Sequence, residues 1–234
     1  TDDGRVKITM KQNEWAVVNN DQNCKAANPI WIENAYEFLN HGGEYYYDKD
    51  TGDLYYIPRD FDDPKTMVLT IPDLERGLTV AGSSSDKKIH NIKFNNLAFR
   101  YFDWFMLNRP ETNGYKSGQN GTLSAKQVPD VGDGRLKGYR EDFAVVIADA
   151  AYVDFTNCQV SKVGGGAFAM REIFQNCNII GNHFYDAAGT GALFGDPSIE
   201  SDFKKYIKPV EYRYYKLNNI IMNNLIHDVT YDYM

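Results

Sequence analysis

Two aspartates stand at matching points of this chain, each at the end of a short apolar stretch. Asp186 closes the segment Asn-His-Phe-Tyr-Asp, and Asp228 closes Asn-Leu-Ile-His-Asp. Two carboxyl groups about 5–10 Å apart can cleave a glycosidic bond, one as acid and the other as nucleophile or base. We therefore predict Asp186 and Asp228 as a catalytic pair. The alternative is that both cap turns, as aspartate commonly does.

Four further side chains could bind a sugar near these aspartates. His183 and His227 could hydrogen-bond a hydroxyl group or adjust a carboxyl pKa. Trp104 and Tyr115 could stack on a sugar face. His183 replaces an asparagine of the repeat described below, so a structural role is an equal alternative for it. Trp104 lies in an apolar run, which favours packing in the core.

Other acidic residues are weaker candidates. Asp149 and Asp154 lie on the preceding unit of the repeat, and Arg171 and Glu172 read as an exposed ion pair. An acidic cluster formed by Asp196, Glu200 and Asp202 is too irregular in spacing to predict a calcium site.

The candidate residues belong to a repeat in which apolar residues alternate with asparagines. The copies are residues 91–97, 152–158, 178–184 and 219–225. Such units bury their apolar faces only when they stack, at a spacing of about 4.8 Å. Asn95, Asn182 and Asn223 then share one position and form a ladder, with Thr156 in the fourth copy. The same alignment places Asp186 opposite His227, with Asp228 one residue later.

This repeat predicts an all-β fold, a right-handed parallel β-helix (a pectate-lyase-like solenoid) over residues 66–234. Two regions rich in glycine, proline or charge, near 108–142 and 196–216, are predicted to be loop insertions. Residues 1–65 form a separate N-terminal segment. Within it, alternating residues around an Asp- and Gly-containing turn predict a β-hairpin at Glu44–Ile57. A helical turn is expected within Trp31–Leu39.

Composition excludes several classes of protein. The 234 residues are 43% hydrophobic, and the net charge of −7 comes without a basic stripe, which argues against binding to nucleic acid. No apolar run is long enough to span a membrane. The three cysteines are too few and too scattered for a disulfide framework or a zinc site, and we expect them to be free and buried. No metal and no cofactor is predicted.

Further motifs carry a resemblance to a known family. They are Trp31–Asn34, Glu37–Leu39, Gly43–Tyr45, Gly52–Tyr56, Phe99–Trp104, Gly164–Gly165, Asn182–Asp186, Gly189–Gly191 and Asn224–Asp228. This combination resembles the right-handed parallel β-helix proteins of bacterial polysaccharide degradation. It is most similar to a branch of glycoside hydrolases with α-L-fucosidase and xylanase members. The chain departs from that family at Tyr185, where a second histidine is usual, and members continue for several coils beyond the position of Met234.

The resemblance implies a glycoside hydrolase that acts on a polysaccharide or oligosaccharide. It also implies a secreted, periplasmic or cell-surface location, a monomer, and a chain that is part of a longer protein. A polysaccharide lyase is one alternative, although a lyase needs a Lys or Arg base, and few such residues lie at the bends. A non-catalytic carbohydrate-binding or adhesive β-helix is the other, and it predicts a shallow aromatic surface in place of paired carboxyl groups.

Overall fold

A computed structural model describes residues 35–48, 50–104, 115–116, 121–127, 136–140, 142–196 and 216–230. The chain divides into two compact units, with a boundary between Ile71 and Pro72. Most of both predicted insertions, Trp31–Asn34, and the side chains of Asp196, Glu200 and Asp202 fall outside the described residues. The same holds for Cys24.

The first unit contains the predicted hairpin. Strands β1 (Tyr45–Tyr47) and β2 (Leu54–Tyr56) pair antiparallel, with Tyr45 opposite Tyr56. In the connecting turn the Asp48 carboxylate accepts hydrogen bonds from the backbone N–H groups of Asp50 (2.9 Å) and Thr51 (3.3 Å). Gly52 follows with φ of +79°, a conformation that disfavours side chains. The turn residues therefore fix this hairpin locally. A short 3₁₀ turn, η1 (Tyr36–Phe38), precedes it.

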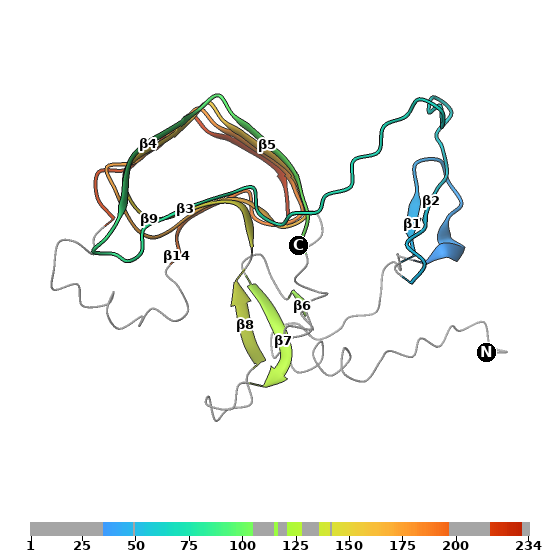
Figure 1. Ribbon diagram of the computed structural model, residues 1–234, viewed down its shortest axis with the longest axis horizontal. Coiled ribbons are helices and arrows are strands. Elements are labelled where there is room, and N and C mark those ends of the chain that lie inside the picture. The colour runs from blue at the N-terminus through green and yellow to red at the C-terminus, as the bar shows by residue number, and fades with distance from the viewer. Residues whose placement is uncertain are drawn as a thin grey trace. The chain divides into compact units, whose positions relative to one another are not determined.

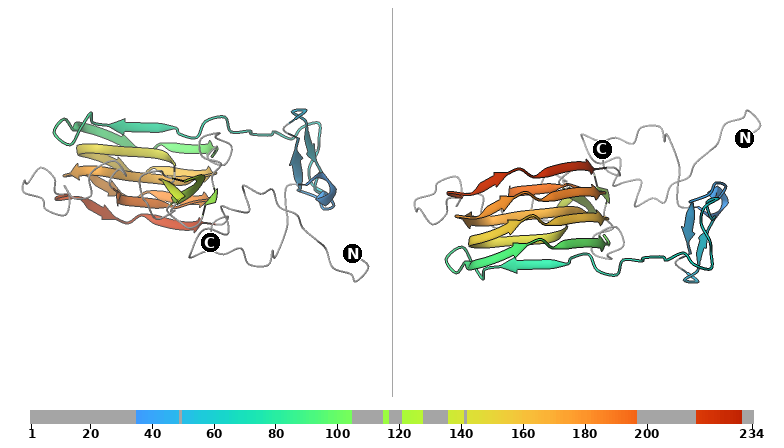
Figure 2. Two further views of the ribbon diagram at one scale, coloured as in Figure 1. Left: turned by 90° about the horizontal axis from the view of Figure 1, so that it is seen from below. Right: turned by 90° about the horizontal axis from the view of Figure 1, so that it is seen from above.

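The second unit is all-β and consists mainly of parallel strands that follow one another around the chain (Figures 1 and 2). Its strands are β3 (Leu78–Ala81), β4 (Ile89–Asn95), β5 (Ala98–Phe102), β9 (Phe143–Thr156), β10 (Gln159–Val163), β11 (Gly166–Gln175), β12 (Asn178–Ile180), β13 (His183–Ala187), β14 (Ala192–Asp196), β15 (Ile220–Met222) and β16 (Leu225–Val229). Between β5 and β9, strands β6 (Tyr115–Lys116), β7 (Gly121–Gln127) and β8 (Leu136–Arg140) form a small antiparallel sheet.

The candidate functional residues lie on the strands of two parallel sheets. One has the strand order β16-β13-β10-β5, and the other has β14-β11-β9-β12-β15, with β3 and β4 also paired to β9. Strands close in sequence, such as β12 and β13, lie in different sheets, whereas each pairs with a strand a full turn of the chain away. The chain therefore winds in stacked coils, and Figure 2 shows the coils in layers.

The coils bend at residues with positive φ, and these residues stack in columns. The pairing register places four such columns at equivalent positions of successive coils: Asn91, Tyr152, Asn176 and Asn218; Asn96, Asn157, Gly181 and Asn223; Tyr101, Lys162, Asp186 and Asp228; and Asp149 with Glu172. Asparagine, aspartate and glycine tolerate this left-handed conformation best. Much of the asparagine in the repeat therefore serves the backbone of the bends.

The register differs from the predicted alignment by two residues between the second and third copies, where Thr156 pairs with Ile180, and by one residue between the third and fourth. Asn178 pairs with Ile220 and not with Asn219, because Asn219 lies beside Cys177 of the coil before. The proposed ladder of Asn95, Asn182 and Asn223 is therefore wrong in its membership, although Asn95 does pair with Thr156. For the same reason Ile220 does not join the inward row predicted for it, because Ile221 and not Ile220 pairs with the buried Ile179. A shift by one residue turns a side chain to the other face of a sheet.

A true ladder forms between Asn182 and Asn224. Asn182 is 1% exposed, and its Oδ1 accepts the backbone N–H of Cys158 at 2.8 Å. Its Nδ2 donates to the backbone oxygen of Phe155 at 2.8 Å and to Oδ1 of Asn224 at 2.9 Å. Asn224 repeats the arrangement one coil later, with Ile179 as its backbone acceptor. Each amide thus satisfies backbone groups on both sides of a bend in the coil before.

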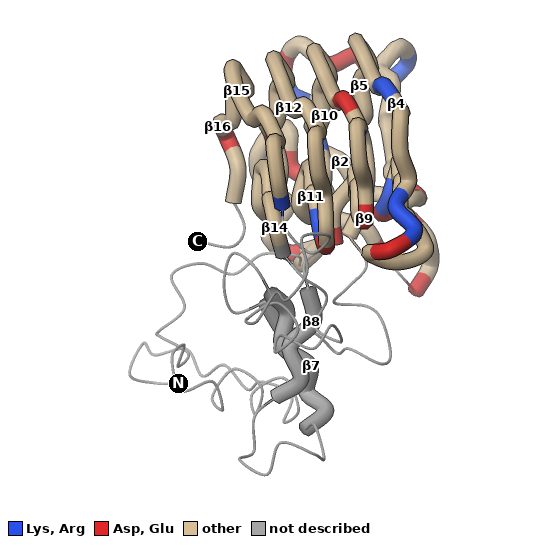
Figure 3. The backbone as a smooth tube through the Cα atoms, turned by 90° about the vertical axis from the view of Figure 1, so that its left-hand side faces the viewer, with Lys and Arg blue, Asp and Glu red and all other residues tan. Residues whose placement is uncertain are grey.

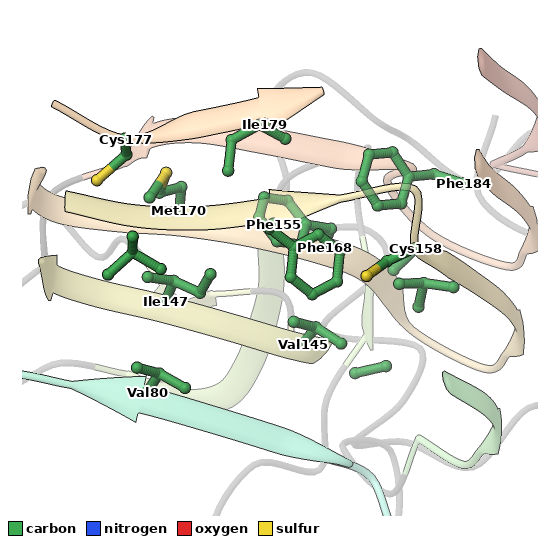
Figure 4. Packing of buried hydrophobic residues seen from close by; sticks show 14 of the residues in the cluster. Val80, Val145, Ile147, Phe155, Cys158, Phe168, Met170, Cys177, Ile179 and Phe184 are labelled. Carbon is green, nitrogen blue, oxygen red and sulfur yellow. The ribbon is translucent and has the colours of Figure 1, made fainter. Parts of the chain in front are cut away.

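The core lies inside the coils, where aromatic rings pack against one another (Figure 4). Phe155 and Phe168, from successive coils, have ring centroids 4.9 Å apart, and Phe168 and Phe184, from one coil, are stacked 5.2 Å apart. Cys158 and Cys177 are buried and free, as predicted. These contacts hold successive coils together, and they fix the spacing at which side chains on the outside of the coils can meet.

Candidate functional site

The two predicted aspartates occupy equivalent positions on neighbouring strands. Tyr185 of β13 pairs with His227 of β16, and Ala187 pairs with Val229, so that Asp186 and Asp228 fall between the same two pairs. Both residues have positive φ, 52° and 50°. The predicted alignment of Asp186 with His227 is therefore wrong by one residue. Adjacent parallel strands lie about 4.8 Å apart, which brings the two aspartates together across one step of the sheet.

Both carboxyl groups face solvent and have cationic or neutral partners. Asp186 Oδ2 lies 2.9 Å from Lys162 Nζ, with the two side chains 44% and 47% exposed. That hydrogen bond and the charge of Asp186 raise the pKa of Lys162. Asp228 Oδ2 lies 2.8 Å from His227 Nδ1, and the Asp228 side chain is 58% exposed. Neither carboxyl is buried, and burial is the usual means by which a catalytic acid keeps its proton at neutral pH.

The two predicted sugar-binding histidines contact each other. His183 Nε2 lies 2.7 Å from His227 Nε2, and Tyr185 stacks on both rings, with centroids 4.2 Å and 5.4 Å away. Desolvation, followed by the neighbouring His227, lowers the pKa of His183. His183 pairs in register with Leu225, so the predicted equivalence to Asn224 is wrong.

Of the two aromatic candidates, the structure describes the side chain of Trp104 but not that of Tyr115. Trp104 is 9% exposed, and a Cβ placed on Gly164 would lie 3.2 Å from the Cβ of Trp104. The Gly164–Gly165 bend thus packs directly against the tryptophan, which fits the core alternative. Tyr115 begins β6 and pairs with Leu123; its side chain is outside the described residues.

A second pair of carboxyl groups lies on neighbouring coils, at Asp149 of β9 and Glu172 of β11. Ala148 pairs with Arg171 and Ala150 pairs with Phe174, so Asp149 and Glu172 occupy the irregular step between the two pairs. Both have positive φ, 44° and 54°. The Asp149 carboxylate accepts the backbone N–H of Ile173. It therefore reaches across to the coil that carries Glu172.

The surroundings of Asp149 favour a protonated carboxyl group. Burial raises the pKa of Asp149 most, and the negative charge of Glu172 raises it further. The Ile173 N–H and the charge of Lys88 act in the opposite direction without cancelling the rise. One oxygen, Oδ1, is fully covered and has no hydrogen-bond partner among the described residues. A buried carboxyl beside a second carboxylate is the arrangement from which enzymes build an acid and a nucleophile.

The backbone around Asp149 explains its burial. Lys88 immediately precedes Ile89, which pairs with Ala150, so Lys88 lies one coil before Asp149 at the same bend. Gly82 packs so closely here that an added Cβ would lie 2.5 Å from the backbone oxygen of Asp149. The strand connection from β3 to β4 thus covers one side of this bend. Figure 3 marks the charged positions along the coils.

The sequence favours Asp186 over Asp149 as a catalytic residue, and it predicts that Glu172 forms an exposed pair with Arg171. The Arg171 guanidinium instead lies over the Phe143 ring, 5.0 Å from its centroid, and both Arg171 and Glu172 are partly buried. The separation of Asp149 and Glu172 in the sequence indicates that they occupy neighbouring coils. Asp149 and Glu172 are 23 residues apart, close to the 24 residues that separate the bonded pair Asp154 and Asn178.

Comparison with known proteins gives one informative likeness. No protein-family model matches the chain, and no curated protein matches it. A solved structure named "Glycoside hydrolase" superposes with a TM-score of 0.62 at 23% identity, over 86% of this chain and 35% of that one. The two share a fold, and this chain spans about a third of the length of that structure. In the part of the chain that the structure describes, no helix has the length and apolarity needed to cross a membrane.

Proposed function

We propose that this chain belongs to a glycoside hydrolase built on a right-handed parallel β-helix, and that Asp149 and Glu172 are its catalytic carboxyl groups. The observation that carries the proposal is the Asp149 carboxyl, which is partly buried with Oδ1 fully covered, has a raised pKa and occupies the position next to a second carboxylate on the next coil. The stacked parallel coils support the β-helix, and the structural neighbour named "Glycoside hydrolase" supports the reaction class.

Each residue has a distinct role in this proposal. Asp149 holds a proton and donates it to the glycosidic oxygen as the bond to the anomeric carbon breaks. Glu172 attacks that carbon and forms a glycosyl ester. Asp149, now ionised, takes a proton from water, which hydrolyses the ester and releases Glu172 as a carboxylate. Adjacent coils lie about 4.8 Å apart, close to the separation of about 5–5.5 Å in retaining enzymes, so we propose retention of configuration.

Asp186 and Asp228 remain the second candidate pair for the same reaction. Their register on β13 and β16 favours them, since it brings two carboxyl groups to one step of the sheet. Their exposure and their pairing with Lys162 and His227 count against an acid role. The substrate in either case is a polysaccharide or oligosaccharide, and action on such polymers fits a secreted or periplasmic protein.

The test compares both pairs under identical conditions. Asp149→Asn, Glu172→Gln, Asp186→Asn and Asp228→Asn are assayed on a panel of aryl glycosides and plant polysaccharides. We expect Asp149→Asn to lose about 10²–10⁴-fold in turnover, the usual range for removal of acid–base catalysis, and Glu172→Gln, which removes the nucleophile, to lose at least as much. Asp154→Asn is the matched control on β9, because Asp154 accepts a hydrogen bond from Asn178 at 2.7 Å and has no catalytic role here.

Three results would overturn parts of the proposal. Full turnover in Asp149→Asn would exclude Asp149, and a loss confined to Asp186→Asn and Asp228→Asn would move the reaction to the second pair. Unsaturated sugar products would identify a lyase. Tight polysaccharide binding with no new reducing ends from any substrate would indicate a non-catalytic binding protein.

A further inference from the structure

Two imidazole nitrogens converge on the outside of the β5–β10–β13–β16 sheet. His183 and His227 come from adjacent strands, and their Nε2 atoms lie 2.7 Å apart. This distance means that the two nitrogens share one proton, with one ring as donor and the other as acceptor. At least one of the two nitrogens therefore carries a lone pair directed at the other ring.

Neighbouring side chains hold both rings in this arrangement. The Asp228 carboxylate lies 2.8 Å from His227 Nδ1, which places a proton on Nδ1 and leaves Nε2 as the acceptor in the neutral ring. Tyr185 stacks on His227 with an interplanar angle of 15° and on His183 with an angle of 27°. The Tyr185 hydroxyl in turn accepts a hydrogen bond from the Gln159 side chain. The two imidazoles are thus oriented before any ligand arrives.

We propose that His183 and His227 bind a divalent transition-metal ion, Zn²⁺ or Cu²⁺, through their Nε2 atoms. A carboxylate on the far nitrogen of a histidine is the usual outer partner of a metal ligand, and Asp228 supplies it for His227. Imidazole favours Zn²⁺ and Cu²⁺ over Mg²⁺ and Ca²⁺. A metal with bonds of about 2.0–2.1 Å replaces the shared proton once the two nitrogens separate by roughly half an ångström.

The site offers two protein ligands, and water completes the coordination. Among the described residues, no group of three or more His, Cys, Asp or Glu side chains could hold a metal ion. A two-histidine site binds more weakly than a structural zinc site and leaves coordination positions open.

Titration calorimetry with zinc chloride tests the proposal on the intact protein after treatment with EDTA. We expect one Zn²⁺ per chain, and a loss of at least about tenfold in affinity in His183→Gln and in His227→Gln. Asp228→Asn should weaken binding about 10–100-fold, the usual effect of removing an outer partner. The chain has four histidines, so His41→Gln and His90→Gln are matched controls that should bind as the wild type does.

A second measurement needs no variant and guards against misfolding. Cu²⁺ added to the unmodified protein should give an electron paramagnetic resonance spectrum with hyperfine splitting from two imidazole nitrogens. The proposal fails if the wild type binds no stoichiometric Zn²⁺, if His183→Gln binds as tightly as the wild type, or if the Cu²⁺ spectrum shows other ligands. In each of those cases the two histidines share only a proton.

Discussion

The bend at Asp149 and the bend at Asp186 place the same chemical group on the same kind of backbone, yet the two carboxyl groups differ in their exposure to solvent. Each aspartate has positive φ and an acidic neighbour at the equivalent position of the next coil, Glu172 or Asp228. Asp186 lies in solvent and pairs with Lys162. Asp149 is largely covered, and burial raises its pKa. Burial, and not residue type or backbone shape, separates the two.

The stacking of the coils produces this difference. At the Asp149 bend Gly82 packs against the backbone oxygen of Asp149, and the N–H of Ile173 donates to its carboxylate. At the Asp186 bend the side chain projects away from the sheet, where Lys162 of the preceding coil meets it. A carboxyl in low dielectric favours its neutral form, whereas a solvated ion pair favours the charged form. An acid catalyst therefore fits the first bend better than the second.

The same contrast applies to the asparagines and gives the largest predicted change in stability. Asn182→Leu removes the partners of two buried backbone groups, the N–H of Cys158 and the oxygen of Phe155. Each unpaired group costs about 1–3 kcal/mol, so for two groups we expect a loss of about 2–6 kcal/mol in the free energy of unfolding. Urea denaturation measures it.

The matched control makes the same substitution at an exposed asparagine. The side-chain oxygen of Asn95 accepts hydrogen bonds from the side chains of Thr156 and Asn157 and not from a buried backbone group of the described residues. Asn95→Leu should therefore change the stability by less than about 1 kcal/mol. Equal losses at both positions would mean that burial does not separate the two asparagines.

A smaller effect is expected at the Asp149 bend, and its sign depends on pH. Because the pKa of Asp149 is raised on folding, the folded protein binds its proton more tightly than the unfolded chain does. The stabilisation is complete below the unfolded pKa of about 3.9 and is lost as the pH rises through the folded pKa. Asp149→Asn should therefore raise the melting temperature at pH 7 and bring no gain near pH 3.

Asp186→Asn provides the contrast in the same melting experiment. That change removes an exposed ion pair and should leave the melting temperature at pH 7 unchanged or slightly lower. If Asp149→Asn lowered the melting temperature at pH 7, the carboxyl would be stabilised in its charged form, and its assignment as the acid would be withdrawn.

Much of the fold could be predicted because its determinants are local and repeated. The hairpin turn at Asp48–Asp53 and the periodic apolar residues of β9 and β12 depend on short-range chemistry that a single sequence displays. The register between coils could not be predicted. It depends on where each bend falls, and the predicted alignment is wrong by two residues at Asn178 and by one more at Asn219.

The candidate site was harder to predict than the fold, because it depends on the register between coils. Sequence reasoning found the neighbouring aspartates at 186 and 228 because both follow a visible copy of the repeat. Asp149 lies inside one continuous strand. No neighbouring residue in the sequence indicates that Gly82 packs against this bend or that the Ile173 N–H bonds the carboxylate. A pKa raised by burial is a property of the packed coils. Only the register, which brings residues 23 positions apart into one column, makes Asp149 and Glu172 visible as a pair.

The smallest predicted effect concerns Lys162, and it tests whether the Asp186 carboxyl is exposed to solvent. Lys162→Met removes the ion pair with Asp186 and keeps most of the side-chain volume. Since both side chains are about half exposed, we expect a loss of less than about 1 kcal/mol in the free energy of unfolding.

The difference in the free energy of unfolding between wild type and variant should shrink in 1 M salt, because salt screens exposed charges. It should also shrink at strongly alkaline pH, because the raised pKa of Lys162 means that its stabilisation is lost as the lysine deprotonates. Urea denaturation at low and high salt measures both effects. A loss above about 2 kcal/mol that persisted in salt would show that Asp186 is shielded from water, and the contrast between the two bends would then no longer favour Asp149.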